Sequence, residues 1–103
     1  MNITEAKTLI DSEFSADNGL DVLFRLSADV EQERITRFIE ALQTIEAHYQ
    51  NEPYIERDLV YKLFSFHQTL QASARHWKVS RPEGLDSKTC FKIFTAIRDI
   101  FAD

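Results

Sequence analysis

The residues of this chain best suited to metal binding or acid–base catalysis are its three histidines, His48, His67 and His76. In di-iron helical bundles a glutamate stands three positions before the histidine, and in helical zinc sites two histidines stand four positions apart. None of the three histidines here has either neighbour. We therefore predict that the histidines bind no metal.

The sequence also offers no clear nucleophile or cofactor site. Cys90 is the only cysteine and shares an apolar helical stripe with Phe94 and Ile97, so we expect it to be a small, unreactive core residue. The chain has no glycine-rich phosphate loop, nucleophile elbow or dinucleotide fingerprint. We predict that the protein is not an enzyme and has no cofactor.

Glycine and proline are too rare in this chain for a β-sandwich or a barrel, whose many tight turns require them. The 103 residues include two glycines and two prolines, whereas 44% are hydrophobic. Apolar residues recur at three- and four-residue spacing in every long segment. The sequence therefore predicts an all-α fold, a compact four- or five-helix bundle that forms a single domain over residues 1–103.

Two long helices dominate the predicted bundle. We expect one over about residues 29–50 and the other over about 53–78, where Pro53 suits a first helical turn. The short connection between them predicts an antiparallel helical hairpin, with a C-terminal helix packed on it. Near the start of the chain, Asn2 and Glu5 have the spacing of a capping box.

Charge is unevenly distributed along the chain. The net charge is -5 and the pI is near 5.1, which disfavours direct binding to nucleic acid or to an anionic membrane. Residues 1–33 carry eight acids and two bases, whereas residues 75–92 carry five bases and two acids. A dipolar surface of this kind can steer a charged protein partner, although acidic surfaces also serve solubility.

Two tyrosines near the start of the second long helix are the strongest candidates for interface anchors. Tyr54 and Tyr61 are seven residues apart, and we expect them to point away from the apolar seam together with Asp58. Aromatic side chains with a polar tip are enriched in protein interfaces. The alternative is that a neighbouring helix covers them, and the same two possibilities hold for Phe91.

These features favour a protein that acts by binding another protein. We expect a stoichiometric neutraliser, such as an immunity protein or an inhibitor, of a basic partner such as a nuclease toxin. The lone cysteine and the absence of a signal-like apolar stretch near Met1 favour the cytoplasm. The candidate partner-binding residues are Asp17, Asp21, Asp29, Glu33, Tyr54, Asp58 and Tyr61.

Two other functions remain open on this sequence. A homodimeric structural or regulatory bundle would use the aromatic surplus for self-association. A phosphotransfer bundle would use an exposed histidine, for which His76 is the candidate. The lysine that follows His76 stands at the wrong spacing for such a domain, and the expected glycine is missing.

Overall fold

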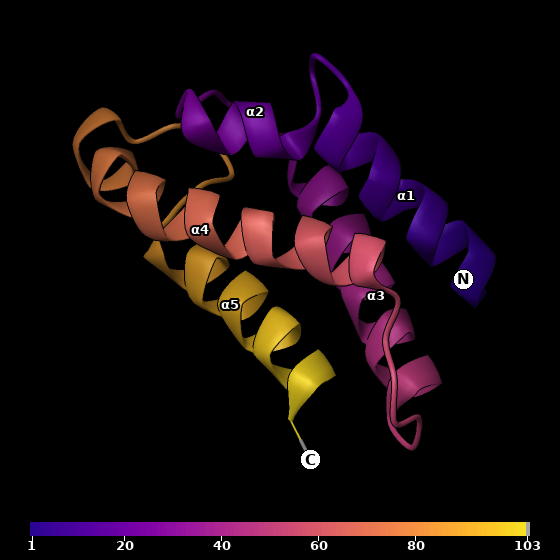
Figure 1. Cartoon of the computed structure of the whole chain (residues 1–103). Helices are drawn as coiled ribbons and strands as arrows, with labels where there is room; N and C mark the ends of the chain where they lie inside the picture. The colour runs from indigo at the N-terminus through magenta and orange to yellow at the C-terminus, as the bar shows by residue number, and fades with distance from the viewer. Residues whose placement is uncertain (103) are drawn as a thin grey trace.

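Five helices and no strand make up residues 1–102, which are the residues that the computed structural model describes (Figure 1). The helices are α1 (Ile3–Ser15), α2 (Leu20–Arg25), α3 (Gln32–Tyr49), α4 (Arg57–Ser80) and α5 (Ser87–Phe101). About 75% of the chain is helical. The predicted all-α fold, a small helical bundle, is confirmed.

Side-chain caps begin two of the helices as the sequence indicates. The Asn2 side chain accepts a 2.8 Å hydrogen bond from the Glu5 amide, and the Glu5 carboxylate accepts one of 3.1 Å from the Asn2 amide. This reciprocal pair is the predicted capping box at the start of α1. At the start of α5, Asp86 accepts a 2.7 Å hydrogen bond from the Thr89 amide.

The start of α4 differs from the prediction. The helix begins at Arg57, so Pro53 lies in the loop of residues 50–56 and not in a first helical turn. The residue before the helix, Glu56, has an extended ψ of 137°, and side chains of α1 and α3 hold its carboxylate. These contacts come from distant parts of the chain, which explains why local sequence signals placed the helix start too early.

The two long helices α3 and α4 do not pack side by side as a close hairpin. No pair of their Cα atoms lies within 8 Å, whereas α1 and α5 both pack against α3. In Figure 1, α4 crosses the middle of the view between α2 and α5, and α3 runs at a steep angle to it. The α5 helix packs on both long helices, as predicted. Because α1 and α5 occupy the apolar face of α3, α4 meets α3 only through large side chains.

Aromatic rings fill the space where α4 crosses α3. The ring centroids of Phe38 and Phe66 are 4.9 Å apart, and Phe24 of α2 lies 6.2 Å from Phe38 and 6.5 Å from Phe66. Trp77 packs 5.5 Å from Phe24 and donates a 3.0 Å hydrogen bond to the Phe24 carbonyl oxygen. This cluster joins α2, α3 and α4 into one core.

Two hydrogen bonds tie the loop before α3 to the loop before α5. Val30 donates a 2.8 Å hydrogen bond to the Glu83 carbonyl, and the Glu83 amide donates one of 2.8 Å to the Asp29 carboxylate. Gly84 has a φ of +80°, and a Cβ at this position would lie 2.1 Å from the Val30 carbonyl oxygen. Only glycine fits here.

Truncating a side chain to alanine should lower the free energy of unfolding more on the buried side of α4 than on its exposed side. Leu63 is fully buried, so Leu63→Ala should lower the free energy of unfolding by about 2–5 kcal/mol. Tyr61, two residues earlier, is mostly exposed, and Tyr61→Ala should cost about 1 kcal/mol or less. Urea denaturation midpoints of the two variants provide the test. Equal losses would show that Tyr61 belongs to the core.

Candidate functional site

The predicted partner-binding residues do not form one site. Asp17, Asp29 and Glu33 are exposed around the α1–α2 turn and the start of α3. Tyr54 and Asp58 lie in the loop before α4 and on its first turn. The acidic group and the tyrosine group therefore come from different parts of the fold.

Asp21 is a correction to the predicted set. Its side chain is buried, with the residue only 6% exposed. One carboxylate oxygen accepts a 2.7 Å hydrogen bond from the Thr69 hydroxyl, and the other accepts one of 2.8 Å from the Arg25 guanidinium. Asp21 therefore links α2 to α4 and cannot face a partner. A helical wheel places it on a polar face of its short helix, and nothing local reveals that α4 covers it.

Asp29 is exposed but already has a structural task. Its carboxylate accepts the hydrogen bond from the Glu83 amide that joins the two loops. Asp17 and Glu33 form no ion pair within residues 1–102. Of the predicted acids outside α4, these two are the ones left free for a partner.

Three aromatic side chains are exposed around the start of α4, and we call Tyr54, Tyr61 and Phe64 the aromatic edge. They are 85%, 61% and 57% exposed, respectively. The exposure that the sequence left open for the tyrosines is thus settled by the fold. The apolar spacing along α4 would place Phe64 beside its buried seam, but Phe64 is exposed because no helix covers its face. Tyr61 and Phe64 share one helix face, since they are three residues apart.

The aromatic edge is supported from below by α1. The Tyr61 ring packs edge to face on Phe14, with centroids 5.8 Å apart, and Phe14 in turn lies 5.9 Å from the buried Phe66. The Tyr61 ring is therefore held on one side while its other side faces solvent. An anchor fixed in this way loses less side-chain entropy on binding than a free one.

An ion network flanks Tyr61. The Lys62 amine lies 2.6 Å from the Asp11 carboxylate of α1 and 2.7 Å from the Asp58 carboxylate one turn earlier on α4. Both carboxylates raise the pKa of Lys62, Asp11 more than Asp58, so the amine stays charged. Two acids share one base, which leaves this network with a net negative charge next to the aromatic edge.

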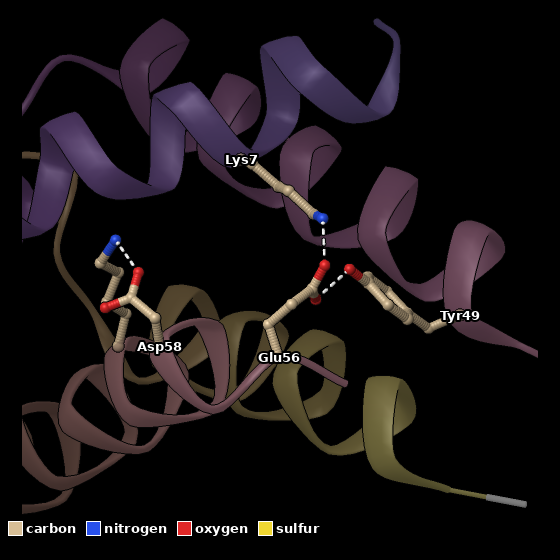
Figure 2. Close-up of polar contacts among 5 residues, drawn as sticks. Lys7, Tyr49, Glu56 and Asp58 are labelled. Atoms are coloured by element: carbon tan, nitrogen blue, oxygen red, sulfur yellow. Dashed lines mark hydrogen bonds and ion pairs between the residues drawn. The ribbon is translucent and has the colours of Figure 1, made fainter. Parts of the chain in front are cut away.

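A second polar cluster holds the loop that carries Tyr54. Figure 2 shows the Glu56 carboxylate pointing toward both Lys7 of α1 and Tyr49 at the end of α3. The Lys7 amine donates a 2.8 Å hydrogen bond to one Glu56 oxygen, and the Tyr49 hydroxyl donates to the other. These hydrogen bonds, Lys7 first, hold the pKa of Glu56 at about 2. Glu56 thereby joins three helices at the base of the loop.

A small pocket lies between the Glu56 cluster and the Lys62 network. Its volume is about 220 Å³, and its walls are Lys7, Glu56, Asp58, Leu59 and Lys62. The charged groups already pair with one another, and both lysines have raised pKa values. A general base or nucleophile needs a group poised to exchange a proton near neutral pH, whereas Lys7, Glu56 and Lys62 are held in their charged states by these contacts.

The histidines and the cysteine lie apart from the aromatic edge. His67 packs on Phe94 with centroids 4.7 Å apart, while His48 and His76 are exposed. Cys90 is buried, and desolvation raises its pKa, as expected for a core thiol. Within residues 1–102 no group of three histidine, cysteine or carboxylate side chains is arranged to hold a metal ion. None of the five helices has the length and apolar content to span a bilayer.

The pH dependence of stability should reveal the Glu56 contacts. Because the pKa of Glu56 is lower in the folded chain than its ordinary 4.5, ionised Glu56 stabilises the fold above pH 4.5. This contribution disappears as the pH falls toward 2. The difference in urea midpoint between the wild type and Glu56→Gln should therefore shrink across this range. Glu52→Gln, in the same loop and without an ion pair among residues 1–102, is the control. A difference for Glu56→Gln that stays constant from pH 7 to pH 2 would contradict the assignment.

The structural role of Asp21 predicts a contrast with its exposed neighbour. Asp21→Ala leaves the Thr69 hydroxyl and the Arg25 guanidinium without their acceptor, and should cost about 1–3 kcal/mol of unfolding free energy. Asp17→Ala should change stability by less than about 0.5 kcal/mol because that side chain is exposed. Denaturant midpoints of the two variants measure both. An unchanged midpoint for Asp21→Ala would return this residue to the candidate binding set.

Comparison with known proteins identifies no relative of this chain. No protein-family model, no curated protein and no solved structure matches the chain. The interpretation of the site therefore depends on the burial, contacts and charge of its own residues.

Proposed function

We propose that this chain is a protein-binding module whose product is a stoichiometric complex, with the aromatic edge as its anchor. The observation that carries the proposal is the exposure of three large aromatic side chains over eleven consecutive positions, 54–64. Tyrosine and other aromatic residues dominate the energetics of protein interfaces, whereas charged residues are depleted from interface cores. The Tyr61 ring already packs on Phe14, so it loses little side-chain entropy when a partner covers its exposed side.

The partner we propose is a basic protein, and the best candidate for the function is neutralisation, as by an immunity protein or an inhibitor of a nuclease toxin. The net charge of -5 supports attraction to a cationic surface. The free carboxylates of Asp17 and Glu33 and the net negative network around Lys62 add to this field. A nuclease cleft is cationic because it binds phosphates, so an acidic protein can occupy it.

The two groups of residues have different tasks in this proposal. Exposed carboxylates act over distance and mainly raise the rate of association. The aromatic edge acts only on contact, so it governs how long the complex lasts. The separation of the two groups in the fold is compatible with this division, because steering depends on the summed field and not on proximity to the contact.

Identification of the partner is the first experiment. The immobilised wild-type chain and a Tyr54→Ala/Tyr61→Ala/Phe64→Ala variant are each incubated with extract of the native host. A protein retained by the wild type and lost with the variant, identified by mass spectrometry, is the partner that we expect, and we expect it to be basic. Equal retention by both proteins, or an acidic partner, would overturn the proposal. A mass of two chains in sedimentation that the triple variant abolishes would favour the homodimer instead.

Binding kinetics with that partner then separate the two tasks. Tyr61→Ala should raise the dissociation rate about tenfold or more, the effect of a central aromatic anchor. Val79→Ala is the matched control, because Val79 is even more exposed than Tyr61 and lies at the far end of the same helix. The association rate should fall between 0.1 M and 1 M salt, as the screening length drops from about 10 to about 3 Å. A salt-independent association rate would show that the acidic charge serves solubility alone.

A further inference from the structure

A second surface lies between α3 and α5, away from the aromatic edge. A groove of about 640 Å³ runs along these helices and is lined mostly by apolar atoms. Ile35, Ile39 and Ala96 form its apolar lining, and Phe91, which is 69% exposed, stands beside them. None of the residues of the aromatic edge lines it. The groove is therefore a surface that the proposed function does not use.

The length and the walls of the groove fit a helix. Its lining on α3 extends from Gln32 to Glu46, and these fourteen steps correspond to about 21 Å, or almost four helical turns. Small or β-branched side chains, including Thr36 and Thr95, line the walls together with Ala96. Such residues leave room for the side-chain ridge of a third helix to enter between the two.

The charged residues along the groove determine what kind of helix can bind there. Glu40, Glu46 and Asp99 line it, against a single base, Lys92. Glu46 forms no ion pair within residues 1–102, and Glu40 is 3.9 Å from the N-terminal amine. Asp99 pairs only with its neighbour in sequence, at 3.2 Å. An apolar floor with an acidic border is complementary to an amphipathic helix that carries Lys or Arg beside its apolar face.

We propose that the α3/α5 groove is a docking site for a basic amphipathic helix of a partner protein, with Phe91 as its aromatic anchor. The charge argues against a second copy of this chain as the occupant. In an isologous dimer two grooves of the same acidic sign would face each other, and Glu46 of each copy, which forms no ion pair within residues 1–102, would gain no base except Lys92. A basic helix meets the same carboxylates with opposite charge, and its apolar side chains cover Phe91.

The test uses the full-length, isotope-labelled chain and an 18-residue helical peptide of leucine and lysine as the probe. Amide chemical shifts should change along the groove, at Thr36, Gln43, Lys92 and Thr95. The affinity should fall tenfold or more in Glu40→Lys/Glu46→Lys and in Phe91→Ala. The control Glu52→Lys/Glu83→Lys has the same net charge change outside the groove, at residues that belong to neither proposed surface, and should lose less than threefold. A peptide with glutamate in place of lysine should not bind.

Three results would overturn this proposal. One is a set of shift changes on the aromatic edge instead of the groove. Another is an equal loss of affinity in the groove variant and in the control, which would mean that the peptide senses only net charge. The third is a dimer in sedimentation that Phe91→Ala dissociates, which would assign the groove to a second copy. Tyr61→Ala should leave peptide binding unchanged, so the failure of this proposal and that of the aromatic edge are distinguishable.

Discussion

The arrangement of the first four helices depends on the packing of one ring, that of Phe66. Its centroid lies 4.9 Å from Phe38 of α3, 5.9 Å from Phe14 of α1 and 6.5 Å from Phe24 of α2. Since α3 and α4 have no backbone approach within 8 Å, such ring contacts carry the crossing between them. Aromatic rings are wide enough to bridge helices that cross at a distance, and their edge-to-face packing fixes the crossing more firmly than aliphatic contact would.

This crossing explains why the start of α4 has an uncovered face. A helix packed along its length in a close hairpin buries a continuous stripe, whereas a helix that crosses its neighbour is covered mainly near the crossing point. Phe66 lies at the crossing, and Tyr61 and Phe64 lie on the outer side of the same turns. The Glu56 contacts then fix the loop before α4 against α1 and α3. The aromatic edge is thus exposed by the packing and held in place by it.

The sequence predicted the elements of this fold far better than their contacts. Three- and four-residue spacing and local caps depend on near neighbours, so the long helices, apart from the start of α4, and the capping box formed by Asn2 with Glu5 were predicted correctly. The burial of Asp21 and the exposure of Phe64 were not, because a periodic pattern assigns a residue to a face without saying which helix covers that face. The exposure of Tyr54 and Tyr61 stayed open for the same reason. The one sequence feature that pointed to the α3/α5 groove was Phe91, which lies off the apolar stripe of its helix.

The distribution of paired and free acids refines what the negative charge can do. Glu13 is buried with Arg34 at 2.6 Å, and Asp21 with Arg25 at 2.8 Å, so these acids in the first third of the chain are neutralised locally. Pairing removes their local potential but not the net charge of the molecule, because the excess of acids over bases is unchanged. At a separation beyond the screening length of about 8–10 Å, salt screens most of the local potential and most of the field of the net charge. Within that distance a partner meets the unpaired carboxylates first, and these border the α1–α2 turn and the α3/α5 groove, whereas at the aromatic edge Lys62 offsets part of the charge of Asp11 and Asp58. Electrostatic attraction and aromatic contact therefore come from different groups of side chains, so the summed field of the acids can steer a partner before it contacts the aromatic edge.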